Sequence, residues 1–229
     1  MFRHEFKYIS PESILTLIQS RVKVILQADS HAVNGIYAIR SLYFDDMYSS
    51  CYKENEDGTD PREKFRIRIY NCSLDRISLE LKQKESSKTH KISCPLSKEV
   101  LFTIMEGKIP AIKDESPYLL KKLIARMHFS MMRPVCIVAY ERTPFIYKTG
   151  NVRITFDRNI RSSSNVEDFY NPDCAFRPVL DSGTNMMEVK YDELLPDHIA
   201  NVMETSLLKQ SSFSKYYLCR KYNTRSTIL

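Results

Sequence analysis

The stretch KFRIRIY, residues 64–70, decides how this chain folds. Read as a β-strand, it alternates between two faces, because successive side chains of a strand point to opposite sides of the sheet. Lys64, Arg66 and Arg68 then share one face with Tyr70, and phenylalanine and isoleucine fill the other. Three cations on one face and apolar side chains on the other predict a sheet whose charged face binds a highly charged ligand.

A second strand of the same kind follows at SLELKQK, residues 78–84. Its Glu80, Lys82 and Lys84 share one face, and two leucines lie on the other. The segment NCSL that joins the two strands is typical of a hairpin turn. The two strands therefore predict one continuous surface with charge on one side and apolar side chains on the other.

The composition fits a soluble globular protein of 229 residues, with 43% hydrophobic and 27% charged residues. The net charge of +6 is unevenly placed, because residues 62–91 hold nine Lys/Arg against four Asp/Glu, whereas residues 44–60 hold six Asp/Glu and one Lys. Linkers, repeats and low-complexity stretches are absent from the sequence. We therefore expect a single domain over residues 1–229.

Cysteine and apolar patterns exclude several classes of protein. The six cysteines are scattered without a C-x-x-C pair, which argues against zinc and favours small core residues in a reducing compartment. The longest apolar run, VCIVAY at 135–140, is too short to span a bilayer. The N-terminus is charged from residue 3, unlike a signal peptide. These features predict a cytoplasmic protein.

Strand-like and helical segments alternate along the rest of the chain. Ser10 and Pro11 predict the start of one helix, Ser97 caps another, a third covers about 115–129 and the last covers SSFSKYYLCRKY. About eight strands, mostly in hairpins, are expected between them. The pattern predicts an α+β fold with a mainly antiparallel sheet closed into a barrel, with helices packed outside.

Cations recur at two-residue spacing on other expected strands, with single glutamates among them. The positions are Arg3, Glu5 and Lys7, then Tyr140 and Arg142, then Arg153, Thr155 and Asp157, then Glu188 and Lys190. One interpretation is a solvated face of a half-buried sheet. Cations in such excess instead favour a wet tunnel in which arginine and lysine bind phosphates. Glutamates among them suit Mg²⁺ or Mn²⁺, which would bridge carboxylate and phosphate oxygens.

Eight short motifs occur in an order that resembles the VTC domain, a polyphosphate polymerase of the triphosphate tunnel metalloenzyme superfamily. They are RHEFKY, SLYFDD, REKFRIRIY, LELKQK, AYERTPF, VRITFD, MMEVKYD and FSKY, and they cover nearly the whole chain. The resemblance implies an antiparallel tunnel barrel that binds a nucleoside triphosphate and Mn²⁺ or Mg²⁺. It implies transfer of the terminal phosphate of ATP to a growing polyphosphate chain.

The resemblance also implies roles for individual residues. The basic catalytic set is Lys7, Arg66, Arg68, Lys82, Arg142, Arg153, Lys190 and Lys215. Tyr140 and Ser214 resemble the family's phosphate-contacting residues, and Lys84 fits the alternation with a looser alignment. Glu188 resembles the metal-binding glutamate. Glu5 and Glu80 are either further metal ligands or partners that hold lysine and arginine in place.

One departure from the superfamily pattern bears on the activity. The first-strand signature E-x-E-x-K reads Arg3-x-Glu5-x-Lys7 here, so that a cation replaces one carboxylate. This argues against the adenylate cyclase and thiamine triphosphatase branches.

Two alternatives remain open at this point: a metal-dependent triphosphatase on the same fold, and a non-catalytic polyanion-binding module. Aliphatic rather than aromatic residues lie between the cations, which argues against nucleic acid as the ligand. Family members are often tethered to membranes by partner subunits, so a separate membrane-protein partner fits the resemblance. The sequence carries no feature that indicates an oligomeric state.

Overall fold

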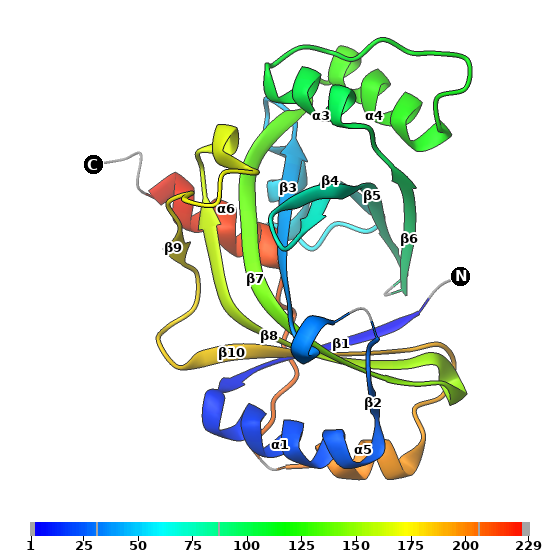
Figure 1. The fold of residues 1–229 in the computed structure, drawn as a ribbon, viewed down its shortest axis with the longest axis vertical. Helices are drawn as coiled ribbons and strands as arrows, with labels where there is room; N and C mark the ends of the chain where they lie inside the picture. The colour runs from blue at the N-terminus through cyan, green and yellow to red at the C-terminus, as the bar shows by residue number, and fades with distance from the viewer. Residues whose placement is uncertain (1–2, 31, 87, 206, 226–229) are drawn as a thin grey trace. The chain divides into compact units, whose positions relative to one another are not determined.

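The computed structural model describes residues 3–30, 32–86, 88–205 and 207–225 (Figure 1). Its sheet has the hydrogen-bonded order β1-β10-β8-β7-β3-β4-β5-β6, with β2 paired to β7 and β9 paired to β8. The strands are β1 (His4–Pro11), β2 (Gln27–Ala28), β3 (Tyr37–Asp45), β4 (Arg62–Tyr70), β5 (Ser73–Glu85), β6 (Lys88–Pro95), β7 (Arg133–Tyr147), β8 (Val152–Ser163), β9 (Arg177–Pro178) and β10 (Thr184–Tyr191). The pairings whose register is described are antiparallel, as the sequence predicted.

Closure of the sheet into a barrel, however, was predicted wrongly. The strand order has two ends, β1 and β6, and these strands are not paired with each other in the described part of the chain. The reason is visible in β6, where Thr89, His90 and Lys91 place polar side chains on both faces. Consecutive polar residues of this kind are a common way to protect an exposed edge strand from further pairing.

Six α-helices accompany the sheet in the part of the chain that the structure describes. They are α1 (Glu12–Ile25), α2 (Ser50–Glu56), α3 (Lys98–Met105), α4 (Tyr118–Phe129), α5 (Asp197–Met203) and α6 (Lys215–Arg225), with 3₁₀ turns η1 (Val33–Gly35), η2 (Thr149–Asn151) and η3 (Val166–Asp168). Ser97 caps α3 as predicted, since its hydroxyl accepts a hydrogen bond from the Val100 N–H. Ser10 was wrongly predicted as a cap, because β1 extends through Pro11 and Pro11 itself precedes the first turn of α1.

The described residues divide into two compact units, each made of separate segments of the chain. The first contains Met1–Ala38, Tyr140–Ile160 and Leu180–Phe213, and the second contains Ile39–Ala139, Arg161–Val179 and Ser214–Leu229. Three of the boundaries fall inside strands, namely β3, β7 and β8. The single domain expected from the sequence stays a prediction.

The first unit buries one face of its strands against α1 and α5. Leu15, Ile18 and Val22 recur at helical spacing on α1 and are fully buried against the strands. The strands contribute Ile154, Phe156, Met187 and Val189, which alternate with polar residues along β8 and β10. Because this apolar face is covered, Arg153, Thr155 and Asp157 of β8 and Glu188 and Lys190 of β10 lie on the other face.

The second unit contains the β3–β4–β5–β6 ladder. α4 contacts β5 and β6, and α2 contacts β4 and α6. Phe65, Ile67 and Ile69 of β4 are at most 1% exposed, which confirms that one face of the KFRIRIY strand is buried. Asn71 and Cys72 turn the chain between β4 and β5 with positive φ angles of 50° and 55°. Two successive positive φ angles match the right-handed twist of a hairpin.

Candidate functional site: two clusters of cations and carboxylates

Three adjacent strands of the first unit, β1, β10 and β8, present polar side chains in cross-strand rows. Residues directly opposite on neighbouring strands share a face, with Cβ atoms about 4.5–5.5 Å apart. The register gives a grid with the rows Lys7–Glu188–Thr155, Glu5–Lys190–Arg153 and Ile9–Met186–Asp157. Positive and negative side chains therefore alternate both along and across β1 and β10.

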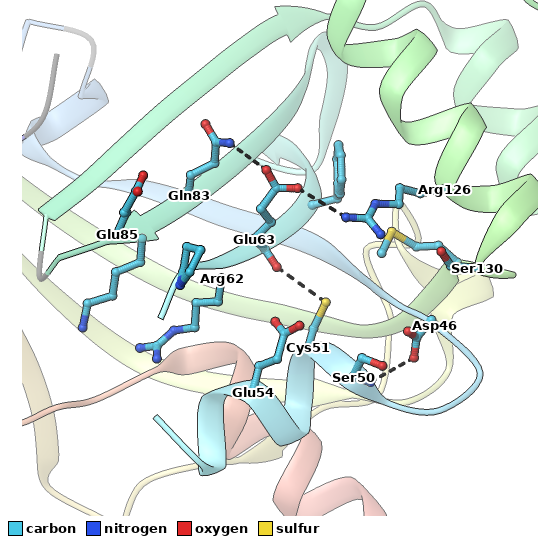
Figure 2. Close-up of a pocket in the computed structure, with 14 residues that line it drawn as sticks. Asp46, Ser50, Cys51, Glu54, Arg62, Glu63, Gln83, Glu85, Arg126 and Ser130 are labelled. Atoms are coloured by element: carbon cyan, nitrogen blue, oxygen red, sulfur yellow. Dashed lines mark hydrogen bonds and ion pairs between the residues drawn. The ribbon is translucent and has the colours of Figure 1, made fainter. Parts of the chain in front are cut away.

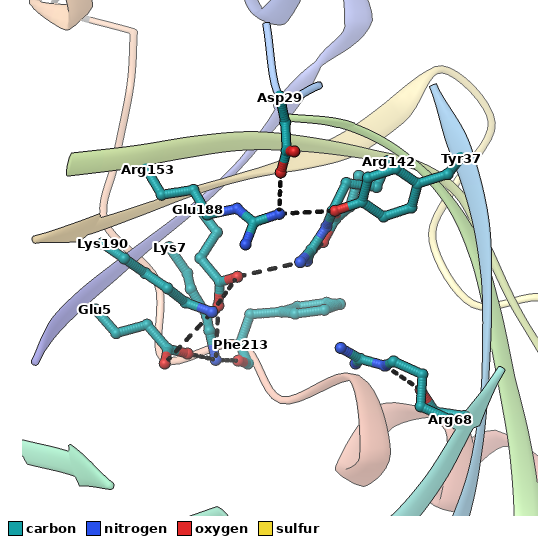
Figure 3. A network of polar contacts seen from close by, with 12 residues as sticks. Glu5, Lys7, Asp29, Tyr37, Arg68, Arg142, Arg153, Glu188, Lys190 and Phe213 are labelled. Carbon is teal, nitrogen blue, oxygen red and sulfur yellow. Dashed lines mark hydrogen bonds and ion pairs between the residues drawn. The ribbon is translucent and has the colours of Figure 1, made fainter. Parts of the chain in front are cut away.

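Two lysines and two glutamates of this grid form a closed set of ion pairs (Figure 3). Lys7 Nζ lies 3.0 Å from Glu5 Oε1 and 4.0 Å from Glu188 Oε1. Lys190 Nζ lies 3.0 Å from Glu188 Oε2 and 4.0 Å from Glu5 Oε2. Both glutamate side chains are less than 10% exposed, whereas the lysines are 20% and 29% exposed. The ammonium groups are therefore the more accessible part of the set.

Arg142, on β7, joins this set through two carboxylates. It donates hydrogen bonds of 2.6 and 2.7 Å to the two oxygens of Asp157, and its Nη2 lies 3.5 Å from Glu188 Oε2. Burial opposes the charged form of Arg142, but Asp157, Tyr140 and Glu188 outweigh it and raise the arginine pKa. The guanidinium also stacks 5.2 Å from the Tyr140 ring. Arg142 is thus a fixed, permanently charged group.

Arg153 is held from the other side by residues that the sequence did not single out. Its Nη2 donates to Asp29 Oδ2 at 2.9 Å and to the Tyr37 hydroxyl at 2.8 Å. Lys7 has a further partner, since its Nζ donates to the Phe213 carbonyl at 3.0 Å. These contacts orient two of the predicted phosphate-binding cations without removing their charge.

The second unit carries a denser set of cations on β4, β5 and β6. Lys64, Lys82 and Lys91 lie directly opposite one another in a single row. Arg62 and Lys84 form the adjacent pair. Like charges placed directly opposite each other destabilise a sheet. This row therefore lowers the stability of the sheet, and an anion bound there would offset the repulsion.

Glu80 supplies the negative charge that offsets part of this repulsion. Its carboxylate lies 2.6 Å from Arg66 Nη2, 3.7 Å from Arg68 Nη1 and 3.0 Å from Lys91 Nζ. Arg66 also donates to the Tyr43 hydroxyl at 2.8 Å. Of the two roles considered for Glu80, these contacts fit the positioning of cations, because three cations surround the carboxylate and the paired positions of this face within 62–68, 78–84 and 89–95 hold no second carboxylate.

The free energy of unfolding of the Glu80→Gln variant should depend less on pH than that of the wild type. Burial raises the pKa of this carboxyl, but Arg66, Arg68 and Lys91 outweigh burial and bring it well below its usual 4.5. The folded state then binds fewer protons, so the stabilisation is complete above about pH 5 and is lost as pH falls. We expect Glu80→Gln to lose about 3 kcal/mol at pH 7 and part of the acid dependence below pH 5.

The check on Glu80 is urea unfolding of both proteins between pH 3 and pH 7. The exposed Glu106→Gln variant serves as a matched control and should follow the wild-type profile. Parallel profiles for wild type and Glu80→Gln over this range would contradict the role given to Glu80.

Helix α6 brings Ser214 and Lys215 to the second unit. Ser214 precedes the helix, and its hydroxyl accepts a hydrogen bond from the Tyr217 N–H at 3.3 Å. Tyr216, two residues after Ser214, is 2% exposed, and its hydroxyl donates a hydrogen bond to the buried Asp45 carboxylate. Asp45 also accepts from the N–H groups of residues 46, 51 and 52. Lys215 thus begins a helix that is anchored to β3 and α2.

A cleft of about 510 Å³ lies in the same unit and shares only the Arg62–Lys84 pair with these cations (Figure 2). It is lined by Glu63, Phe65 and Gln83, which occupy the face of β4 and β5 opposite to that of Arg66. Glu63 there pairs with Lys122 at 2.6 Å. Of the predicted site residues, Lys84 alone lines this cleft. The cleft is therefore not the predicted phosphate site.

The carboxylates of the two clusters differ in how well they suit a divalent cation. Among the described residues, three or more His, Cys, Asp or Glu side chains do not gather in one place for a metal. Mg²⁺ usually binds through one or two carboxylates and completes its ligands with substrate phosphates and water. Glu188 and Glu5 supply the two carboxylates of this mode: they lie on a diagonal of the grid, and a bound cation would replace Lys7 and Lys190 at their oxygens.

A family model and two solved structures are similar to this chain. A family model described as the VTC domain matches residues 2–223. The structure of HpAC1 from Hippeastrum, described as an adenylyl cyclase candidate with a dominant triphosphatase activity, is similar with a TM-score of 0.57 and 13% identity, over 97% of this chain and 96% of that chain. The PH1819 protein of Pyrococcus horikoshii OT3 gives a TM-score of 0.49 and 13% identity, over 97% and 99%. No curated protein matches the chain.

Proposed function

We propose that this chain, which belongs to the VTC domain family, is a polyphosphate polymerase that transfers the terminal phosphate of ATP to a growing polyphosphate chain. ATP and polyphosphate are the substrates assigned to it. The membership supports this assignment, and the arrangement of cations in each unit supports a linear polyanion as the ligand. The separate membrane-protein partner stays a prediction. Within the described ranges, none of the helices has the length and apolar character that crossing a bilayer requires.

The observation that carries the proposal is the row Lys64–Lys82–Lys91 with its neighbours Arg66 and Arg68. Glu80 is the one carboxylate on the face of β4, β5 and β6 that carries these cations, counted over the paired positions within 62–68, 78–84 and 89–95. A surface with that excess of positive charge gains stability when a polyanion binds. Arginine forks match phosphate oxygens in pairs, and lysines add point charge.

The first unit supplies the groups that phosphoryl transfer needs. The reaction depends on positioning and on neutralising charge at the transferred phosphate, with little covalent work by the protein. Arg142 is fixed by Asp157, and Lys7 and Lys190 are accessible, so these three cations would bind phosphate oxygens. Glu188 and Glu5 would hold Mn²⁺ or Mg²⁺, which when bound would neutralise charge on the leaving phosphates.

Incubation with ATP and Mn²⁺, followed by separation of long phosphate chains from free phosphate, tests the proposal. Long chains are the expected product. Free phosphate without chains would identify a triphosphatase, in which water takes the acceptor's place. ATP left intact would identify a non-catalytic polyanion-binding module. Either of these two results would overturn the polymerase assignment.

A further inference from the structure

Thr155 is the one uncharged polar residue in the grid formed by β1, β10 and β8. It lies directly opposite Glu188, in the row that begins with Lys7. Its side chain is 2% exposed. Within the described part of the chain, its hydroxyl has no hydrogen-bond partner. A buried hydroxyl without a partner destabilises a protein, so native structures rarely contain one unless it has a use.

A second unpaired donor lies two residues away on the same face of β8. Arg153 uses Nη2 to bind Asp29 and Tyr37, but its Nε is buried and, among the described residues, has no acceptor. Residues two apart on a strand point to the same side, about 7 Å from each other. Two neighbouring donors without acceptors indicate that the missing group is an acceptor.

The carboxylates near Thr155 are engaged by cations. Both oxygens of Asp157 accept from Arg142, and Glu188 meets Lys7, Lys190 and Arg142. The cations of the same grid, Arg153, Lys7 and Lys190, donate and do not accept. An acceptor supplied from outside the protein would therefore be an anion, because the surrounding positive charges favour one.

We propose that the Thr155 hydroxyl, together with Arg153 Nε, binds an oxygen of a phosphate group of the substrate. This inference rests on the proposed function. It adds a neutral donor to a set of proposed phosphate-binding residues that otherwise act through their charge. A hydroxyl contributes through a directed hydrogen bond, so it selects the position of one phosphate oxygen, whereas lysines attract phosphate over longer distances.

Calorimetric titration with tripolyphosphate in EDTA tests the proposal without depending on catalysis. Thr155→Val keeps the shape of the side chain and removes the hydroxyl, and Thr155→Ser keeps the hydroxyl. We expect Thr155→Val to bind tripolyphosphate about tenfold or more weakly, as for loss of a hydrogen bond to a charged group. Thr155→Ser should stay within about twofold of the wild type.

Two controls separate binding from folding. The melting temperature of Thr155→Val without ligand should equal or exceed that of the wild type, because a methyl group replaces an unsatisfied hydroxyl. Thr16→Val removes an exposed hydroxyl from α1, which covers the opposite face of the sheet, and should bind normally. If Thr155→Val is too unstable to titrate, Thr155→Ala provides a second variant without the hydroxyl.

The outcomes distinguish this inference from the proposed function. Wild-type affinity for tripolyphosphate in Thr155→Val, or equal losses of affinity in the valine and serine variants, would overturn the role given to the Thr155 hydroxyl and leave the proposed function standing. A wild-type protein that fails to bind tripolyphosphate would overturn both.

Discussion

Replacement of Glu188 by glutamine should lower the turnover of ATP by about 10²- to 10³-fold, as for other losses of a group that stabilises charge in the transition state. Glu188 is the carboxylate on which the first cluster converges, since Lys7, Lys190 and Arg142 all contact it. Glutamine has nearly the same shape and cannot hold a divalent cation as a carboxylate does. The measurement is the initial rate of ATP consumption in saturating Mn²⁺.

The same variant should bind tripolyphosphate more tightly than the wild type when EDTA removes divalent cations. The substitution deletes a negative charge among three cations, so an incoming anion meets less repulsion. Loss of activity together with a gain in metal-free affinity would separate a metal-holding role from a role in phosphate binding. Glu167→Gln removes an exposed carboxylate and should change neither quantity. Full activity in Glu188→Gln would contradict the account of this cluster.

Replacement of Asp157 by asparagine should lower the free energy of unfolding by about 3–5 kcal/mol. Asp157 is completely buried and Arg142 is 7% exposed, so the substitution leaves a buried guanidinium without its bidentate partner. Because whole proteins are stable by only about 5–15 kcal/mol, this is a large fraction of the total. Urea unfolding at pH 7 gives the comparison.

Asp157→Asn can be matched with Glu106→Gln, which removes the partner of Lys108 from an exposed ion pair. That control should unfold at the wild-type urea concentration. An Asp157→Asn protein as stable as the wild type would show that Arg142 does not depend on Asp157, and it would remove the reason for treating Arg142 as a fixed charge.

Alternation along the strands made most of the sheet predictable. KFRIRIY and SLELKQK keep strict two-residue spacing because one face of each is buried, so the strands and their hairpin followed from the sequence. The open edges of the sheet could not be predicted from the sequence. Closure into a barrel depends on whether β1 and β6 pair, and the local periodicity of a strand carries no information about that. Ser10 looked like a helix cap, but its pairing with Asn185 extends β1 past it.

The candidate site was predictable where charge follows the strand period. Glu188, Lys190 and Lys7 lie on one face of β10 and β1, as their spacing indicated. Lys91 was missed because its alignment with Lys82 depends on the register of β5 and β6. Asp29 was missed because it lies outside the strands and meets Arg153 only in the folded chain. Thr155 was noted on its face, but the missing partner of its hydroxyl is visible only in the structure.

The central claim is that the cations of each cluster bind phosphate groups, and a crystal structure with tripolyphosphate and Mn²⁺ tests it most directly. The account predicts phosphate oxygens within hydrogen-bond distance of Arg66 and Lys82 in the second unit, and of Arg142 and Lys190 in the first. Phosphates bound in the cleft beside Glu63, with Arg66, Lys82, Arg142 and Lys190 free of ligand, would contradict it.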